Sequence, residues 1–287
     1  MTQFVFEAIG THWIIDIYQP LSIEKEAEVI SGIKENISDF EKTFSRFRTD
    51  SIVHAISQNA GEYVFPLYAQ KLLDIYKTLY EKTDGFFTPL IGSALVSAGY
   101  DKEYSLQQKE VLQKTLLWED VLSYEYPILQ TSIPIQLDFG AAGKGYLIDL
   151  VGEVLQSFGI QYFCIDAGGD ILYKNTTPLA IGLENPEDTT QVLGVYQLQN
   201  KSIAGSSGAR RAWGDFTHII NPKTLVSPRE IIAVWVVADT AIVADALTTC
   251  LFFVEPHTLM DSFKFEYLVV YKDFSIKKSA NFSADLF

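Results

Sequence analysis

The spacing of apolar side chains along the first third of the chain predicts strands followed by long helices. Residues 3–19 alternate polar and apolar side chains and are rich in β-branched and aromatic types, which is typical of strands, and Gly10-Thr11 marks a turn within them. Residues 22–47 and 67–82 instead repeat apolar side chains every three or four positions, which predicts two amphipathic helices. Gly85, just after the second stretch, suits the end of a helix.

The remainder of the chain predicts many short strands and two more helices. The predicted elements, in order, are a strand (133–139), a glycine-rich turn (140–145), a helix (146–158), a buried strand (162–165), a tight turn (166–170), strands at 179–183, 192–198, 202–204 and 231–237, a helix (240–253) and a closing pair of strands (267–271 and 274–277). We find no low-complexity linker and no strict repeat. The pattern therefore favours one α+β domain over residues 1–287, with mixed or antiparallel sheets and packed helices.

Composition limits what such a domain can bind. The 287 residues are 48% hydrophobic, enough to bury a sizeable core, and carry a formal net charge of −14. An acidic surface repels nucleic acid phosphates and anionic lipid headgroups, so neither is an expected partner. An anionic ligand must then be received locally, by a metal ion, a lysine or the N-terminus of a helix.

The cysteines and the hydropathy pattern indicate no disulfide, zinc site or membrane span. Cys164 and Cys250 each lie in an apolar run, which favours two buried reduced thiols over a disulfide or zinc site. No apolar run approaches the length of a membrane span, and the N-terminus shows no signal-peptide pattern. The sequence as it stands is expected to be cytoplasmic; a signal removed from the chain would make it periplasmic or membrane-anchored.

The segment Asp245-Ala-Leu-Thr-Thr249 is a candidate cation site. On a helix, residues four apart share a face, so the Asp245 carboxylate and the Thr249 hydroxyl can converge on one point. Two such hard oxygens suit Mg²⁺, which completes its shell with phosphate and water. An ordinary helix with a solvent-facing Asp is the alternative, but this helix is apolar almost all round, and a buried carboxylate needs a partner.

Two further segments carry candidate chemistry. Asp138, at a predicted strand end, precedes three glycines and Lys144, which together form a plausible anion cradle; a simple surface turn is the alternative. Asp138 itself can hydrogen-bond a ribose hydroxyl or a ring N–H. His218 lies among hydroxyl-bearing residues, although a lone histidine is more often structural. A Ser-His-Asp hydrolase is excluded because no G-x-S-x-G motif occurs, and the turn 166–170 is equally compatible with a structural or a functional role.

Taken in order, these segments resemble the FAD:protein FMN transferase (ApbE) family over nearly the whole chain. The resemblance is carried by Ile9-Gly-Thr11, Ser45-Arg-Phe-Arg-Thr-Asp-Ser51, Thr83-Asp-Gly-Phe-Phe-Thr-Pro89, Leu137-Asp-Phe-Gly-Ala-Ala-Gly-Lys-Gly-Tyr146 with Asp149, Ala167-Gly-Gly-Asp170, Ser206-Ser-Gly208, His218-Ile-Ile-Asn-Pro222 with Thr224, and Ala244-Asp-Ala-Leu-Thr-Thr249. Each motif is weak alone, and the family's order and spacing make the set specific.

The resemblance implies a T-fold-like ApbE architecture and an enzyme that binds FAD and Mg²⁺, attaches FMN through a phosphoester bond to a threonine or serine of a target flavoprotein, and releases AMP. The implied metal ligands are the Ala141 carbonyl, the Asp245 carboxylate, the Thr248 carbonyl and the Thr249 hydroxyl. The implied FAD contacts are Ile9, Phe47, Phe86, Phe87, Thr88, Asp138, Lys144 and Ile220. His218 and Asp245 are the implied catalytic residues, with His218 activating the incoming hydroxyl or protonating a departing oxygen.

Several positions depart from the family's usual pattern. Asn221 stands in place of an aspartate and Leu225 in place of a glycine, Arg210 in place of an aromatic residue, Thr88 in place of an aspartate and Gly143 in place of an alanine. The metal-binding helix keeps its pattern. The resemblance therefore leaves open two alternatives to transfer, a Mg²⁺-dependent FAD pyrophosphatase and a protein that binds FAD without turnover.

Overall fold

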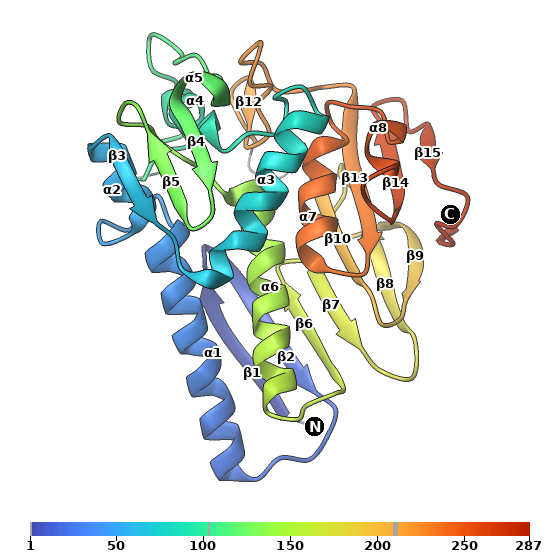
Figure 1. The fold of residues 1–287 in the computed structure, drawn as a ribbon. Helices are drawn as coiled ribbons and strands as arrows, with labels where there is room; N and C mark the ends of the chain where they lie inside the picture. Colours follow the sequence, from blue (N-terminus) through green and yellow to red (C-terminus); the bar gives the residue numbers. More distant parts are fainter. Residues whose placement is uncertain (1, 103, 209–211) are drawn as a thin grey trace.

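An eight-stranded sheet runs through the molecule (Figure 1). The computed structural model describes residues 2–102, 104–208 and 212–287. The strand order is β1-β2-β6-β7-β10-β13-β14-β15, and each neighbouring pair is antiparallel. The strands are β1 (Thr2–Ala8), β2 (Thr11–Ile17), β6 (Phe163–Ala167), β7 (Asp170–Lys174), β10 (Ser202–Ser207), β13 (Ile231–Ala238), β14 (Phe265–Tyr271) and β15 (Ile276–Lys278).

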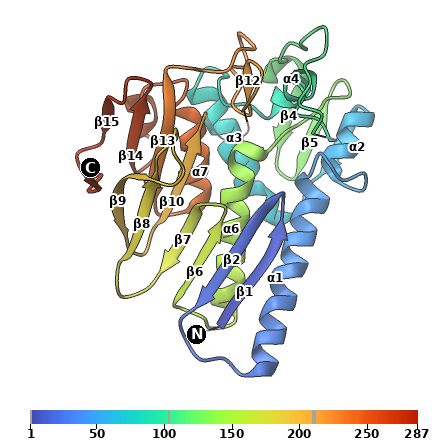
Figure 2. The ribbon, with the colours of Figure 1, turned by 180° about the vertical axis from the view of Figure 1, so that it is seen from behind.

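Three helices cover one face of this sheet. α1 (Ile23–Phe44), α6 (Gly140–Ser157) and α7 (Ala241–Cys250) lie side by side in front of the strands in Figure 1 and behind them in Figure 2. α1 turns its apolar stripe, which includes Val29, Ile33 and Phe40, toward the core. The main apolar core lies between these helices and the sheet.

Smaller elements complete the fold. A second core fills the opposite face of the large sheet, beneath the small sheet β16-β9-β8. The small sheets comprise β16 (Asp285–Leu286), β9 (Val192–Leu198) and β8 (Leu179–Glu184); β3 (Gly61–Val64), β5 (Ile128–Thr131) and β4 (Leu122–Glu125); and β11 (Ala212–Trp213) with β12 (Phe216–Thr217). The shorter helices are α2 (Ile52–Gln58), α3 (Gln70–Lys82), α4 (Gly92–Ala98), α5 (Trp118–Val121) and α8 (His257–Met260), with 3₁₀ turns at Leu67–Ala69 and Pro89–Ile91.

Most of the predicted elements form, and the fold is the predicted α+β arrangement of antiparallel sheets with packed helices. The predicted turn at 166–170 joins β6 to β7, with Gly168 and Gly169 at φ 65° and 95°. The helix predicted at 240–253 forms as α7 and ends earlier, at Cys250, whereas the strand predicted at 202–204 continues to Ser207 as β10.

Two local predictions are wrong. Residues 133–139 are in no sheet, because their backbone N–H groups pair with a helix and a 3₁₀ turn: the Ile135 N–H donates to the Ile56 carbonyl in α2 at 3.2 Å, and the Asp138 N–H to the Pro89 carbonyl at 2.8 Å. Residues 140–145 are the first turns of α6 and not a loop. Gly145 is required for close packing, since a Cβ there would lie 2.2 Å from a carbonyl oxygen of α7.

Both cysteines are buried and free, as predicted. Burial raises the pKa of the Cys164 thiol to about 12, and it raises the pKa of Cys250 as well. Neither thiol is therefore poised for nucleophilic chemistry at neutral pH. Across the described residues, no helix is long and apolar enough to cross a membrane.

Candidate functional site

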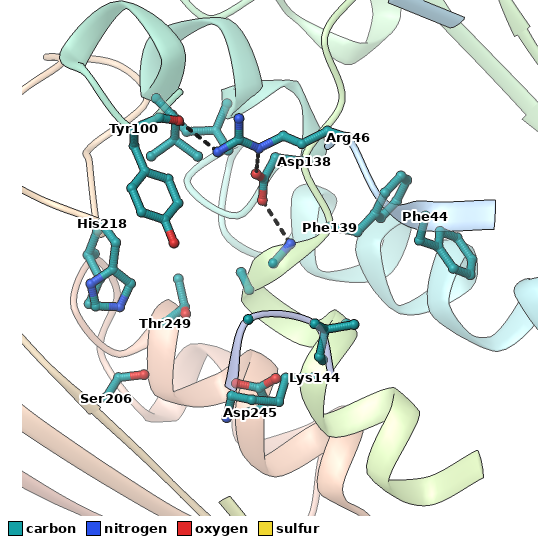
Figure 3. A pocket seen from close by; sticks show the side chains of 18 of the residues that line it. Phe44, Arg46, Tyr100, Asp138, Phe139, Lys144, Ser206, His218, Asp245 and Thr249 are labelled. Carbon is teal, nitrogen blue, oxygen red and sulfur yellow. Dashed lines mark hydrogen bonds and ion pairs between the residues drawn. The ribbon is translucent and has the colours of Figure 1, made fainter. Parts of the chain in front are cut away.

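A cavity of about 960 Å³ opens where α6 begins and α7 ends (Figure 3). Its walls come from segments distant in sequence: the β1–β2 turn, the end of α1 with the residues after it, residues 86–104, the start of α6, the β6–β7 turn, β10, residues 218–222 and the end of α7. A volume of this size accommodates a large organic ligand. Figure 3 shows the side chains of Tyr100, His218, Asp245 and Thr249 around the same space.

The two helices bring opposite ends to this cavity. α7 runs antiparallel to α6, because Ala241 at its start pairs with Asp149 well inside α6, whereas Asp245, one turn later, pairs with Gly145 near the start of α6. The N-terminus of an α-helix carries partial positive charge and its C-terminus partial negative charge. The cavity therefore offers one helix end suited to an anion beside another suited to a cation.

Asp138 shapes the start of α6. Its Oδ1 accepts a hydrogen bond from the Gly140 N–H at 2.8 Å, and its Oδ2 pairs with the buried Arg46 Nε at 2.5 Å. Arg46 also donates to the Tyr100 carbonyl at 2.8 Å, and its guanidinium lies 4.1 Å from the centre of the Phe47 ring. This carboxylate is thus held in one orientation and retains lone pairs that can accept from a ligand.

We expect Arg46→Lys to lower the free energy of unfolding by about 1–2 kcal/mol, measured by urea denaturation. A lysine ammonium is a single point and cannot reach the Asp138 carboxylate and the Tyr100 carbonyl in the geometry that the planar guanidinium allows. Arg48→Lys is the matched control, since Arg48 pairs with the exposed Asp50 and such surface pairs contribute little. An equal loss of unfolding free energy in the two variants would contradict the conclusion that Arg46 holds Asp138 and the Tyr100 carbonyl together.

Asp245 is a buried carboxylate on the cavity wall. Its Oδ2 accepts a hydrogen bond from the Gly145 N–H at 2.8 Å. Burial raises the pKa of the Asp245 carboxyl, whereas the Lys144 ammonium and the Gly145 N–H act in the opposite direction. A carboxylate buried in this way is strongly stabilised by a nearby cation.

The end of α7 carries further oxygen atoms at or next to the cavity wall. Thr249 lines the cavity, and the buried Thr248 hydroxyl donates to the Asp245 carbonyl at 2.7 Å and contacts the Ser206 hydroxyl at 2.8 Å. Backbone N–H groups after the helix donate to the carbonyls of Leu247, Thr249 and Cys250. Among the described backbone hydrogen bonds beyond the helix, none reaches the Thr248 carbonyl, which makes it one of the unpaired acceptors typical of a helix C-terminus.

Lys144 reaches from α6 to the start of β7. Its ammonium forms an ion pair with the buried carboxylate of Asp170, which also accepts a hydrogen bond from the Gly205 N–H at 3.2 Å. Lys144 remains part of the cavity wall, about a quarter exposed. Asp170, at the end of the turn 166–170, is therefore the buried anionic partner of a lysine that lines the cavity.

Aromatic side chains line several parts of the cavity. Phe47 stacks against Tyr104, with centroids 5.9 Å apart, and Tyr100 stacks against Trp213 at 5.8 Å. The Phe86 ring is stacked at 5.7 Å on that of Phe253 in the segment after α7. These rings give the cavity apolar surface that suits a planar heterocyclic ligand.

The residues predicted from the sequence gather at this one cavity. Its lining includes Ile9, Phe47, Phe86, Phe87, Thr88, Asp138, Ala141, Lys144, His218, Ile220, Asp245 and Thr249. Thr248 lies directly behind the wall, fully buried, and Phe87 has its ring packed on Tyr76 in the core. Arg210 lies outside the described residues.

The sequence indicates no individual roles for Arg46, Tyr100, Asp170 or Ser206. Arg46 is one of two arginines in the aromatic segment at the end of the first long helix. Asp170 and Ser206 lie in motifs that carry the resemblance, but their partners, like those of Tyr100, depend on contacts between distant segments. In the described parts of the chain, no three His, Cys, Asp or Glu side chains cluster as a metal site, so a cation here would use one carboxylate, neutral oxygens and its ligand.

Comparison with known proteins identifies relatives in sequence and in fold. The sequence matches the ApbE family over residues 9–268. A FAD:protein FMN transferase from Rhodobacter capsulatus is 26% identical over 196 residues, which is 63% of this chain and 37% of that protein. Another from Escherichia coli (strain K12) is 23% identical over 289 residues, 92% of this chain and 82% of that protein. The structure of the flavin transferase ApbE from Vibrio cholerae shares the fold, with a TM-score of 0.84 and 20% identity over 98% of this chain and 97% of that one.

Proposed function

The chain belongs to the ApbE family, and on this premise we propose that it is a Mg²⁺-dependent FAD:protein FMN transferase. In the proposed reaction, the hydroxyl oxygen of a threonine or serine in a target flavoprotein attacks the FMN phosphorus of FAD. The bond from that phosphorus to the bridging oxygen breaks, and AMP leaves with that oxygen. The hydroxyl proton passes to a base. The relatives named for this activity support the proposal.

The observation that carries the proposal is the meeting of the α6 N-terminus and the α7 C-terminus at one cavity. A pyrophosphate with a bound divalent cation needs an anion site directly beside a cation site. The start of α6, with Lys144, suits the phosphates, and the end of α7, with Asp245, suits the cation. The overall charge of −14 gives no general attraction for an anion, so such a local site is required.

The residues present fit a magnesium ion. The Asp245 carboxylate, the Thr249 hydroxyl and the carbonyls of Ala141 and Thr248 would hold it. In a regular helix the Gly145 N–H would donate to the Ala141 carbonyl, four residues earlier. Here the same N–H donates to the Asp245 carboxylate, which therefore competes with the Ala141 carbonyl for this hydrogen bond. The Thr248 carbonyl lacks a partner from the segment after α7. Both carbonyls are therefore better placed to bind a cation than those of a regular helix.

A bound Mg²⁺ neutralises pyrophosphate charge and makes the phosphorus accessible to a nucleophile. The side chains around it position the substrates. Asp138 and the aromatic side chains of Phe47 and Phe86, which line the cavity, orient the nucleoside and flavin parts of FAD. His218, on the cavity wall, takes the hydroxyl proton or protonates the departing oxygen.

The proposal is tested by incubating the protein with FAD and Mg²⁺, with and without a candidate flavoprotein domain. We expect the added mass of FMN on a threonine or serine of the acceptor, detected by mass spectrometry, together with release of AMP. Free FMN formed at the same rate with and without acceptor would replace the transferase by a pyrophosphatase. FAD that co-purifies and yields no AMP over hours would leave a binding protein.

A further inference from the structure

A pair of reciprocal contacts fixes α6 against α7. The Asp149 carboxylate on α6 accepts hydrogen bonds from the N–H groups of Ala241 and Ile242 at the start of α7, at 2.8 and 3.0 Å. One turn along, the Gly145 N–H on α6 donates to the Asp245 carboxylate on α7 at 2.8 Å. Each helix thus gives a carboxylate to the other and receives a backbone N–H in return.

The spacing of these contacts is regular. Gly145 and Asp149 are four residues apart on α6, and Ala241 and Asp245 are four residues apart on α7, so both pairs lie on facing sides of the two helices. Gly145 permits this approach, because a Cβ there would lie 2.2 Å from the Ala241 oxygen and 2.6 Å from the Asp245 Cβ. A slip of either helix along the other would break both contacts together.

Asp149 does not line the cavity, although its carboxyl group is buried. It lies about one helical turn farther along α6 than Gly145, which pairs with Asp245, and the α7 N-terminus that it caps has no side-chain cap of its own from Thr240. The Lys71 ammonium, at 4.0 Å, is its nearest cationic neighbour. The N–H groups at the start of α7 need only a hydrogen-bond acceptor. A serine or asparagine at the N-cap of α7 would supply one without burying a carboxylate, so capping alone does not account for Asp149.

We propose that Asp149 is a positioning residue that sets the place of the Asp245 carboxylate, and hence the cation affinity of the site. By anchoring the first turn of α7 to α6, it fixes the depth at which the last turn of α7 meets the start of α6. This inference rests on the proposed function, because it takes Asp245 as a cation ligand. Groups that orient a metal ligand typically change metal affinity about 10- to 100-fold when removed.

The test is Mn²⁺ binding, followed by electron paramagnetic resonance, in the unchanged protein and in Asp149→Asn, Asp149→Ala and Asp245→Asn. Binding is measured at a temperature at which circular dichroism shows each variant to be folded. We expect the Mn²⁺ dissociation constant to rise about tenfold in Asp149→Asn, further in Asp149→Ala, and beyond detection in Asp245→Asn.

Glu266→Gln is the matched control. Glu266 is as buried as Asp149 and also holds two partners, the Tyr196 hydroxyl at 2.8 Å and the Lys201 ammonium at 2.6 Å, and neither Glu266 nor these partners line the cavity. We expect this variant to lose thermal stability with no change in Mn²⁺ affinity. If Asp149→Asn behaves in the same way, the role of Asp149 is purely structural and the inference is wrong.

A measurement on the unchanged protein covers the case in which the Asp149 variants do not fold. If the anchor couples the two ends of α7, Mg²⁺ binding should slow hydrogen exchange of the Ala241 and Ile242 amides more than that of amides in β14. If the protein binds Mg²⁺ but the Ala241 and Ile242 amides exchange at the same rate with and without it, the role of Asp149 is wrong and the proposed metal site stands. If the unchanged protein binds neither Mn²⁺ nor Mg²⁺, the proposed metal site is wrong as well.

Discussion

Asp245→Ala is expected to lower the rate of AMP release from FAD at least about 10³-fold at saturating Mg²⁺, measured by chromatography of the nucleotide products. The carboxylate is the one anionic side chain among the proposed cation ligands, and the others are neutral oxygens. Its loss removes the charge that holds the ion next to the pyrophosphate. Raising the Mg²⁺ concentration should restore little, because carbonyl and hydroxyl oxygens alone bind Mg²⁺ weakly.

Asp245→Asn separates the loss of the ion from any loss of structure. Asparagine keeps an oxygen that can accept the Gly145 N–H and has nearly the same volume, so we expect an intact fold by circular dichroism. Activity should fall nearly as far as in the alanine variant. An Asp245→Asn enzyme that cleaves FAD at the original rate would refute the placement of the metal at the end of α7.

The large elements of the fold were accessible from sequence because their patterns are long and regular. The apolar spacing of α1 and α3 and the β-rich runs of β9, β13 and β14 each persist over several periods. The start of α6 is not predictable in this way, because glycine is common both in turns and where two helices pack closely. The glycines of Gly140–Gly145 predict a turn, whereas Gly145 lets α7 approach α6, and this contact depends on a helix about 100 residues later in the chain.

The candidate site was likewise predictable only where the spacing of its residues is local. Asp245 and Thr249 could be paired from sequence because both lie on one helix and their spacing is local. The partners of these residues could not, since the Arg46–Asp138 and Lys144–Asp170 pairs join segments separated by 92 and 26 positions. For such pairs the sequence supplies the charges, and only the fold determines which of them meet.

Replacing Gly145 by alanine should have the second-largest effect on activity, although it adds a single methyl group. That group would lie 2.2 Å from the Ala241 oxygen and 2.6 Å from the Asp245 Cβ, and the backbone of α7 must therefore move away. We expect the free energy of unfolding to fall by about 1–3 kcal/mol in urea denaturation, although alanine favours a helix interior over glycine by about 1 kcal/mol. A displacement of Asp245 by about 1 Å should lower FAD cleavage about 10²-fold.

Gly143→Ala is the control for this prediction, because it makes the same change two residues earlier in α6. A Cβ at position 143 would lie 3.5 Å from the Phe40 ring and 4.0 Å from the Phe139 Cβ, and both are ordinary contacts. Helix propensity should then dominate, and the variant should be more stable than the unchanged protein by about 0.5–1 kcal/mol. The two substitutions thus have opposite expected signs for one chemical change. Equal stability of the two variants would mean that α6 and α7 are not held at the distance that Gly145 permits, and the geometry assigned to the cation site would have to be abandoned.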